Sequence, residues 1–430
     1  MDMSNDIALI LFGSLLVLFF LKVPIGFSIG IASVLTLMLC TRVPLQVVPQ
    51  RLFTATDSFP FMAVPFFILS GSLMEQGGIS QRLISLASAF LGACHGGLGM
   101  VSIVACMFFA AISGSSAATT AAIGGIMIPA MVKHSYDVGF ASAVNASAGT
   151  IGIIIPPSIP FVTYAVLTGA SVGAMFLGGM IPGLLMGLSL IVIVYVISRK
   201  RGYKDEYTAS WHDCWVAFKD AILAIFMPII VIGGIYSGMF TPTEAAVVAV
   251  VYAFVIGTFV YRQLKFKVIV DVLIESAVST AGILFLIAAA SLFGWILTNN
   301  RIPDVIAKWM LSVSSNPVII LLLINVLLLV VGTFLDTVAA LIILVPILFP
   351  ISVQLGIDPI HFGLIICVNL AIGQVTPPFG ICLFVACGVS GIKLEKIAKS
   401  VLPFILALVV DVLLVTYLPW LSTWLPRALM

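Results

Sequence analysis

Long apolar runs separated by short polar segments occupy the chain from end to end. A helix needs about 20 apolar residues to cross the hydrocarbon core of a bilayer. Runs of roughly this length or longer predict membrane-crossing helices at 7–21, 25–40, 60–75, 138–168, 174–198, 214–238, 243–261, 271–298, 360–391 and 401–424. The pattern therefore predicts an all-α polytopic membrane protein.

Two further apolar stretches, 97–132 and 317–350, are interrupted in the middle by small and polar residues. The first interruption runs from Ser113 to Ser116, and the second from Gly332 to Thr337. Each flanking arm should have about 15 residues, which is short for a full crossing. We therefore expect two re-entrant helical hairpins with tips near the midplane, where non-helical backbone is tolerated only if protein or water surrounds it.

Each predicted hairpin is followed by an apolar segment with a Pro-Pro pair, Pro156-Pro157 and Pro377-Pro378. Proline removes a backbone donor and disfavours helix before it, so the segments 138–168 and 360–391 should be broken helices. The two pairs lie 221 residues apart, and the order hairpin, broken helix, plain helix occurs twice. The sequence therefore predicts an internal duplication.

The basic residues predict the topology. With the N-terminus outside and each hairpin counted as zero crossings, 14 of the 19 Lys and Arg residues fall on the cytoplasmic side, in agreement with the positive-inside rule. The second half then has the opposite orientation to the first, and such inverted repeats are a signature of secondary transporters. The predicted parts are N-terminal scaffold helices with an arm (1–58), a first repeat (59–198), connecting scaffold helices (199–270) and a second repeat (271–424). The segments 43–56, 79–95 and 303–315 look amphipathic and should lie in the membrane interface as arms.

Composition excludes several classes of protein. Charged residues make up 8% of the 430 residues and hydrophobic residues 62%, whereas soluble domains carry about 25% charged residues. Soluble enzymes and nucleic-acid binders are therefore excluded. The chain has no phosphate-binding GxxxxGK[ST] loop and no HExxH zinc motif, so we predict that it is not an enzyme. Asp2 and Asp6 precede the first apolar run, which argues against a cleaved signal peptide.

The helix ends at the hairpin tips and breaks should form the functional site. Free carbonyl groups end one half-helix and free N–H groups begin the next, and Na⁺, as a hard ion, prefers oxygen ligands. The alternative is that the Ser and Thr side chains at such positions only cap helix ends. The candidate ion ligands are Ser113, Ser115, Ser116, Asn145, Thr150, Gly332, Thr333, Asp336, Thr337, Asn369, Gln374 and Thr376.

Two carboxylates stand inside apolar runs. Asp336 should be paired or ligating, because a charged group at the bilayer centre costs roughly 2.5–3.5 kcal/mol even on insertion scales; capping the following helix is its structural alternative. Asp411 belongs to no tip, and we interpret it as a structural residue facing the bundle, with a proton relay as the alternative.

The substrate should lie at the same tips and breaks. An anionic substrate would face the half-helix N-termini. Arg301 is placed either to attract an organic anion or in the headgroup region. The candidate substrate residues are Ser116, Pro156, Pro157, Thr376, Pro377 and Arg301.

Four spaced motifs resemble a known family. The run from Ser113 to Pro129, the segment around Pro156-Pro157-Ser158, the block Thr241-Pro-Thr-Glu-Ala245 and the segment Thr376-Pro-Pro-Phe-Gly380 are similar to the large membrane subunit of tripartite ATP-independent periplasmic (TRAP) transporters. The resemblance covers essentially the whole chain, and sialic-acid members look most similar.

The resemblance implies an elevator-type fold and Na⁺-driven uptake of an organic acid across the bacterial inner membrane, with a periplasmic N-terminus. It also implies a small four-helix membrane subunit, expected here as a separate polypeptide, and a periplasmic solute-binding protein that delivers the substrate. Three rival hypotheses are a stand-alone ion-coupled anion carrier of the same architecture, a channel and a membrane enzyme. Transport by the purified chain alone would favour the first, and ion currents without substrate the second.

Overall fold

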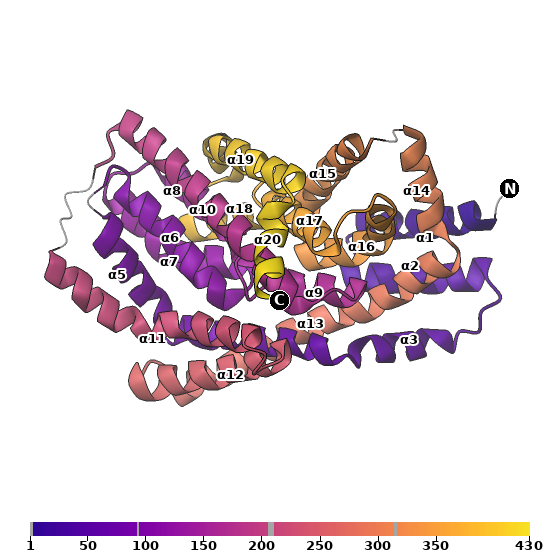
Figure 1. Cartoon of the computed structure of the whole chain (residues 1–430), viewed down its shortest axis with the longest axis horizontal. Helices are drawn as coiled ribbons and strands as arrows, with labels where there is room; N and C mark the ends of the chain where they lie inside the picture. Colours follow the sequence, from indigo (N-terminus) through magenta and orange to yellow (C-terminus); the bar gives the residue numbers. More distant parts are fainter. Residues whose placement is uncertain (1–2, 93, 205–209, 314–315) are drawn as a thin grey trace.

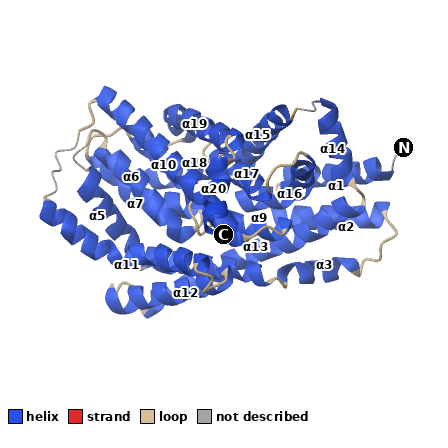
Figure 2. Ribbon diagram, viewed as in Figure 1, coloured by secondary structure: helices blue, strands red, loops and turns tan. Residues whose placement is uncertain are grey.

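The computed structural model describes residues 3–92, 94–204, 210–313 and 316–430, and the regular elements of this part are all helices, apart from one isolated β-bridge between His95 and Lys204 (Figures 1 and 2). Eight of its helices are long and apolar enough to cross a membrane, or up to nine if one bent pair is counted as a single span. The bent pair joins Val47–Thr56 to Phe59–Gln76 at an angle of 60°. The prediction of an all-α polytopic membrane protein is confirmed.

The N-terminal helices pack against a long helix from the middle of the chain. Helix α1 pairs with α2, and both α2 and the amphipathic arm α3 pack along α13 (Figure 1). A 3₁₀ turn, η1, leads into α4, which packs against α12. The bounds are α1 Met3–Phe20, α2 Ile25–Cys40, α3 Val47–Thr56, η1 Phe59–Met62 and α4 Ala63–Gln76.

The first hairpin and the first broken helix follow a second amphipathic arm, α5. The hairpin consists of α6 and α7, and the broken helix consists of α8 with the 3₁₀ turn η2, a non-helical segment and α9. The bounds are α5 Ile79–Leu91, α6 Gly97–Ser113, α7 Ser116–Lys133, α8 Val138–Gly149, η2 Thr150–Ile153, α9 Ile159–Thr168 and α10 Val172–Arg201.

Two antiparallel helices, α11 and α12, connect this half to the next. A side-chain and backbone capping box starts each of them, at Ser210 and at Thr241, and a short π-helical turn, η3, ends α12. The bounds are α11 Trp211–Tyr236, α12 Pro242–Val255, η3 Ile256–Val260 and α13 Phe266–Asn299.

The second half repeats the order of the first. An amphipathic arm, α14, precedes the hairpin α15–α16, the broken helix α17–α18 and the long helix α19, and a short helix, α20, ends the chain. The bounds are α14 Ile302–Val313, α15 Pro317–Phe334, α16 Thr337–Gln354, α17 Pro359–Gly373, α18 Ile381–Ser390, α19 Leu394–Tyr417 and α20 Trp420–Leu429.

The two halves pack into one another reciprocally. Helix α9 of the first half packs on α16 of the second hairpin, and α18 of the second half packs on α7 of the first hairpin. The long helices α10 and α19 also contact each other. The breaks predicted from Gly, Ser and Pro residues therefore lie in elements through which the two halves pack against each other.

Two predictions of element bounds are corrected, for the hairpin arms and for the last crossing. The hairpin helices have 17 residues in α6 and 18 in each of α7, α15 and α16, so the expected arms of about 15 residues were too short, and α7, α15 and α16 are long enough to count as candidate spans. The predicted last crossing at 401–424 was shifted, because α19 starts at Leu394, and the chain breaks at Leu418 before α20. The predicted arms match α3, α5 and α14, although residues 314–315 of the last one lie outside the described residues.

Candidate ion and substrate site at the hairpin tips

The first hairpin turns over two residues. Helix α6 ends at Ser113, Gly114 takes a left-handed conformation with φ 60°, and Ser115 caps the start of α7 by accepting a hydrogen bond from the Ala118 N–H at 3.4 Å. The Ser113 and Thr119 hydroxyls lie 2.8 Å apart, which ties the two arms together. A Cβ atom at residue 114 would lie 2.8 Å from the Pro157 carbonyl oxygen, so glycine is required both by φ and by the close approach of the first break.

The second hairpin turns at Leu335 and Asp336. Asp336 caps α16, and its Oδ2 accepts a hydrogen bond from the Val338 N–H at 3.0 Å. The tip is tied to the second break, because the Gly380 N–H donates to the Thr333 carbonyl oxygen at 3.1 Å. Helix α15 also meets the end of α17 backbone to backbone, since a Cβ atom at Gly373 would lie 2.5 Å from the Gly332 carbonyl carbon.

Gln374 joins the two hairpins. Its side chain is buried at the C-terminal end of α17, and its Oε1 accepts a hydrogen bond from the Ser116 hydroxyl of the first hairpin. Its Nε2 donates to Oγ1 of Thr337, the first residue of α16, at 2.6 Å. One amide therefore connects the first helical residues after the two tips, and its contact with Ser116 spans 258 positions of sequence.

The two tips differ in their exposure. The first tip is largely buried against residues 154–158, which are all buried. The second exposes the Asp336 carboxylate, Pro378 and Phe379, with the Phe334 and Phe379 ring centroids 5.1 Å apart. The carboxylate is therefore the open polar group of the second tip, while the first tip offers backbone and hydroxyl oxygens from a closed environment.

Several predicted hydroxyl ligands cap their own helices. Thr150 donates to the Ser147 carbonyl oxygen at 2.7 Å, Thr333 to Val330 at 2.8 Å and Thr376 to Ile372 at 2.8 Å. A hydroxyl that donates its proton keeps two oxygen lone pairs, so this geometry fits helix capping and leaves each oxygen able to face a cation.

The two predicted asparagines occupy corresponding places in the broken helices, each five residues before the C-cap of α8 (Thr150) or of α17 (Gln374). In one orientation, the Asn145 amide nitrogen donates to Ser102 Oγ on α6 at 3.3 Å. In the other, it donates to the Thr120 carbonyl oxygen at 2.9 Å and its oxygen accepts from the Gly124 N–H at 3.1 Å. Asn369 donates to Asn325 Oδ1 on α15 at 2.9 Å. Asn369 therefore fastens its broken helix to the descending arm of the second hairpin, whereas Asn145 fastens its broken helix to the descending arm α6 in one orientation and to the ascending arm α7 in the other.

Pro156 and Pro157 lie buried in the first break, beside Gly114, and Thr376 and Pro377 lie half-buried in the second. Arg301 is not brought to them: it is exposed between α13 and α14 with φ 52°, and no hydrogen bond or ion pair between it and a tip residue occurs among the described residues.

Sequence reasoning missed part of this network. Ser102, Thr119 and Thr120 line the interior of the first hairpin, and Asn325 and Cys382 lie in the second half beside Asn369 and Gln374. Asn325 gave a signal, because a lone amide within the apolar segment 317–334 needs a buried partner. The threonines gave none, since Ser and Thr occur widely in apolar helices.

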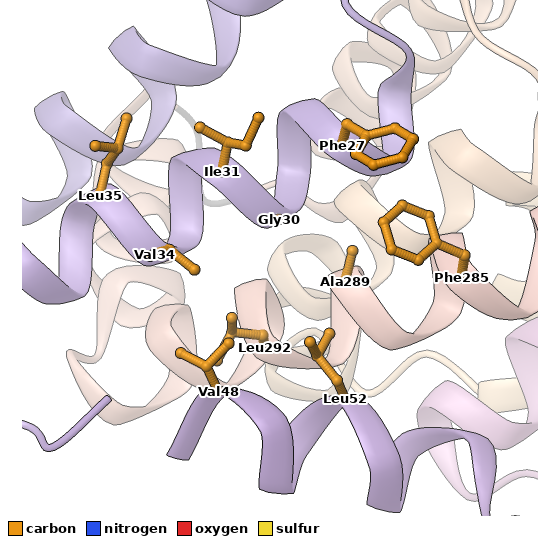
Figure 3. A pocket seen from close by; sticks show the side chains of 10 residues that line it. All are labelled: Phe27, Gly30, Ile31, Val34, Leu35, Val48, Leu52, Phe285, Ala289 and Leu292. Carbon is orange, nitrogen blue, oxygen red and sulfur yellow. The ribbon is translucent and has the colours of Figure 1, made fainter. Parts of the chain in front are cut away.

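The helix ends define what the site can do. The starts of α7 and α16 meet at Gln374 through the side chains of Ser116 and Thr337, and each of these helices follows directly on the C-terminal end of α6 or α15. Such ends carry partial negative and positive charge, so one region can bind a small cation through oxygens and an anionic group through N–H donors. A separate pocket of about 290 Å³ between α2, α3 and α13 (Figure 3) has only apolar side chains, such as Phe27, Leu52 and Phe285, and does not suit an anion.

The chain is similar to known transport proteins along nearly its whole length. Residues 12–421 match the family model described as the tripartite ATP-independent periplasmic transporter, DctM component. It is 47% identical to the isethionate TRAP transporter permease protein DctMQ of Oleidesulfovibrio alaskensis over 95% of this chain and 65% of that protein. It is 40% identical to the C4-dicarboxylate TRAP transporter large permease protein DctM of Rhodobacter capsulatus (98% and 99% covered), and 39% identical to the sialic acid TRAP transporter large permease protein SiaM of Vibrio cholerae (95% and 96% covered).

A solved structure shares the fold. The chain superposes on the Alcanivorax borkumensis YdaH transporter with a TM-score of 0.63, over 89% of this chain and 90% of that one, at 16% sequence identity. The sequence matches settle the family. This multi-pass protein of the bacterial inner membrane is a transporter component rather than an enzyme, and it belongs to the DctM family of large permease components of tripartite ATP-independent periplasmic transporters.

Proposed function

We propose that the protein carries out Na⁺-coupled uptake of an organic acid, with the coupling ions held at the two hairpin tips. The observation that carries this proposal is the link from Ser116 through Gln374 to Thr337. Because one buried amide connects both tips, an ion that orders one tip changes the surroundings of the other. Cation binding and completion of a substrate pocket are then coupled through direct contacts rather than over a distance.

Asp336 is the proposed ligand with a full charge. It lies at the N-terminus of α16, where the partial positive charge of the helix end stabilises a carboxylate. Its oxygens, together with the terminal carbonyl groups of α15, of which that of Thr333 also accepts from the Gly380 N–H, would supply oxygen ligands, which suit a hard cation. In the first hairpin, the carbonyl groups near Ser113 would have the same role without a carboxylate.

The substrate proposed is a small organic acid delivered by a periplasmic binding protein. The relatives are named for isethionate, C4-dicarboxylates and sialic acid, at 47%, 40% and 39% identity. These identities do not single out sialic acid, whereas an anionic head group is common to all three. The N-terminal ends of α7, α16 and α18, which carry partial positive charge, would face this group.

The proposed partners are a small four-helix membrane subunit and a soluble binding protein. The isethionate relative, of which this chain covers 65%, has a name that joins the M and Q components. The reciprocally packed body of hairpins and broken helices would move as an elevator against a scaffold of α1, α2, α11, α12 and the arms. In this proposal the halves are inverted repeats, the hairpins are re-entrant and the N-terminus is periplasmic.

The test is Na⁺ activation of uptake by Asp336→Asn in proteoliposomes that contain the small subunit, with the binding protein supplied outside. Removing the carboxylate should raise the Na⁺ concentration for half-maximal uptake at least several-fold. The matched control is Asp304→Asn, which removes an exposed carboxylate in the first turn of α14. A Na⁺ activation curve for Asp336→Asn that superposes on the wild type would contradict the ion site.

A stand-alone carrier is the competing function, because the shared fold with the YdaH transporter does not by itself require a binding protein. Liposomes with the purified chain alone would then take up substrate in a Na⁺ gradient. We expect no uptake until both partners are added.

A further inference from the structure

A buried carboxyl group lies where the two long helices of the repeats cross. Asp411 in α19 is 2% exposed, and its Oδ2 is 2.5 Å from Oγ of Ser189 in α10. The helices α10 and α19 occupy the same place in the two halves, and positions 189 and 411 differ by 222, close to the 221 that separates the Pro-Pro pairs. The pair therefore joins nearly equivalent positions of the duplicated chain, far in sequence from either hairpin tip.

The contacts of the Ser189 hydroxyl bear on the protonation state of Asp411, because this hydroxyl has a single proton. Ser189 Oγ lies 2.9 Å from the Met186 carbonyl oxygen and 2.5 Å from Asp411 Oδ2. A hydroxyl has one proton to donate and two lone pairs to accept with. If the carboxyl group were ionised, the single proton could satisfy only one of two acceptors. If the carboxyl group is protonated, it donates to Ser189, Ser189 donates to Met186, and both contacts are hydrogen bonds.

No cation compensates a charge at Asp411 within the described chain. The two ion pairs there are Lys396–Asp137 and Arg427–Asp358, and neither includes Asp411. The helices packed against α19 are α8, α10, α17 and α18. Their charged or titratable residues, with those of α19 itself, are Tyr195, Arg199, Lys200, Arg201, His361, Cys367, Cys382, Cys387, Glu395, Lys396, Lys399 and Tyr417.

The charged members of this set lie at helix ends. Arg199, Lys200 and Arg201 are in the last turn of α10, and Lys399, the basic residue of α19 nearest in sequence, is about 18 Å from Asp411 along the helix axis. His361 is occupied by Ser422 Oγ at 2.7 Å and by the Thr416 carbonyl oxygen at 3.2 Å. An ionised Asp411 would therefore be an unpaired charge within a membrane-crossing helix, which is strongly disfavoured.

We propose that Asp411 is a proton-binding site: it holds a proton at working pH and donates a hydrogen bond to Ser189, which links α10 to α19 as a neutral pair. The proton stays in place during transport, because the carboxyl group is buried and no described cavity is lined by it. The consequence is a dependence on pH. An unfolded aspartate ionises near pH 4, so the folded state gives up stability progressively as the pH rises above that value.

The direct test is infrared difference spectroscopy of the complete transporter at neutral pH. The wild type minus Asp411→Asn difference should contain a carboxylic acid C=O stretching band, which a carboxylate lacks. In Ser189→Ala the band should remain, but its frequency should rise to that of a carboxylic acid that donates no hydrogen bond. If Asp411→Asn does not fold, the wild type minus Ser189→Ala difference still reports the acid. Absence of an acid band in both differences would overturn the proposal.

A second measurement follows the thermal midpoint between pH 5 and pH 9. Asn at position 411 keeps an N–H donor for Ser189 but cannot ionise, so its midpoint minus that of the wild type should increase with pH. The matched control is Asp57→Asn, an exposed aspartate before η1, whose difference from wild type should stay constant. A constant difference for Asp411→Asn would contradict the protonated state. Neither readout involves Na⁺ or substrate, so each stands or fails independently of the proposed function.

Discussion

At the scale of single residues, Gln374 links the two hairpin tips through a neutral side chain, which no charged residue could do at this buried position. A buried carboxylate or ammonium between the two tips would need a counter-charge, whereas an amide both accepts and donates. Its oxygen accepts from Ser116 and its nitrogen donates to Thr337. The amide oxygen contacts the first hairpin and the amide nitrogen contacts the second. The contact therefore specifies the relative position of both tips without a net charge.

Replacing Gln374 by Leu should lower the stability of the packed hairpins and broken helices. Both hydroxyl groups would remain buried without this partner, and each unsatisfied group costs about 1–3 kcal/mol. We expect a lower thermal midpoint and at least a tenfold loss of Na⁺-dependent uptake, measured in detergent and in proteoliposomes respectively.

The control for this substitution is Gln354→Leu. Gln354 is the last residue of α16 and is exposed, so the same change of side chain should leave both measurements near the wild-type values. If Gln374→Leu also behaved like the wild type, the amide link would have no role in stability or transport.

The sequence reveals single residues only when they are unusual for their surroundings. Asp336 was identified because a carboxylate in an apolar run needs a partner, a ligand or a capping role. The specific partners of Gln374 could not be predicted, because they come from residues 258 and 37 positions away and a sequence carries no information on such pairings without relatives. Arg301 was proposed from its charge alone, and the described structure leaves it outside the tip cluster.

At the scale of elements, glycine determines how closely a hairpin approaches its broken helix. Helix α15 packs along α17, and the two backbones touch at Gly332 and Gly373. Small residues allow helices in membranes to approach each other closely. The contact places the second tip directly on the second break, which keeps the free helix ends together.

Gly373→Ala should separate these elements. The added Cβ would lie 2.5 Å from both Cα and the carbonyl carbon of Gly332, and no side-chain rotation can relieve a contact with backbone. Forced overpacking costs about 1–3 kcal/mol, so the thermal midpoint and uptake should both fall. Gly388→Ala in α18 is the matched control, because a Cβ there meets nothing within 4 Å; equal behaviour of the two variants would refute the role of the contact.

Elements were predictable where the sequence contains breakers. The turn at Gly114 and the breaks at the Pro-Pro pairs lie where Gly, Ser and Pro residues indicated. The hairpin arms were predicted too short, because the helices continue into the predicted interruptions, as α15 does through Gly332 and Thr333. The end of α19 was predicted too late, because the apolar run continues past Tyr417. The chain turns at Leu418 and Pro419 and α20 then packs on α10 and α17, so a tertiary contact determines this end.

At the scale of the whole molecule, the reciprocal packing of the halves explains why the duplicated elements form one body. Neither broken helix packs only with its own hairpin: α9 contacts α16 and α18 contacts α7. Any movement of one hairpin therefore displaces part of the other half. This arrangement favours motion of the body as a unit over independent opening of each tip. Whether the two tips can form one site then depends on the orientation of the two hairpins in the membrane.

That orientation gives a final prediction, for labelling in intact cells. If the repeats are inverted, the residues that flank the first hairpin lie in the cytoplasm and those that flank the second lie in the periplasm. Cys94, an exposed native thiol just before α6, should react with a membrane-impermeant maleimide only after the cells are opened. The thiol introduced by Gln354→Cys, at the exposed end of α16, should react from outside.

The other accessible thiols are removed first. The partly exposed Cys40, Cys214 and Cys387 are replaced by Ser, and Cys94 is replaced as well when Gln354→Cys is tested. Because an odd number of crossings between the two positions is required for opposite labelling, reaction of both cysteines from the same side would contradict the inverted arrangement and, with it, the shared midplane site.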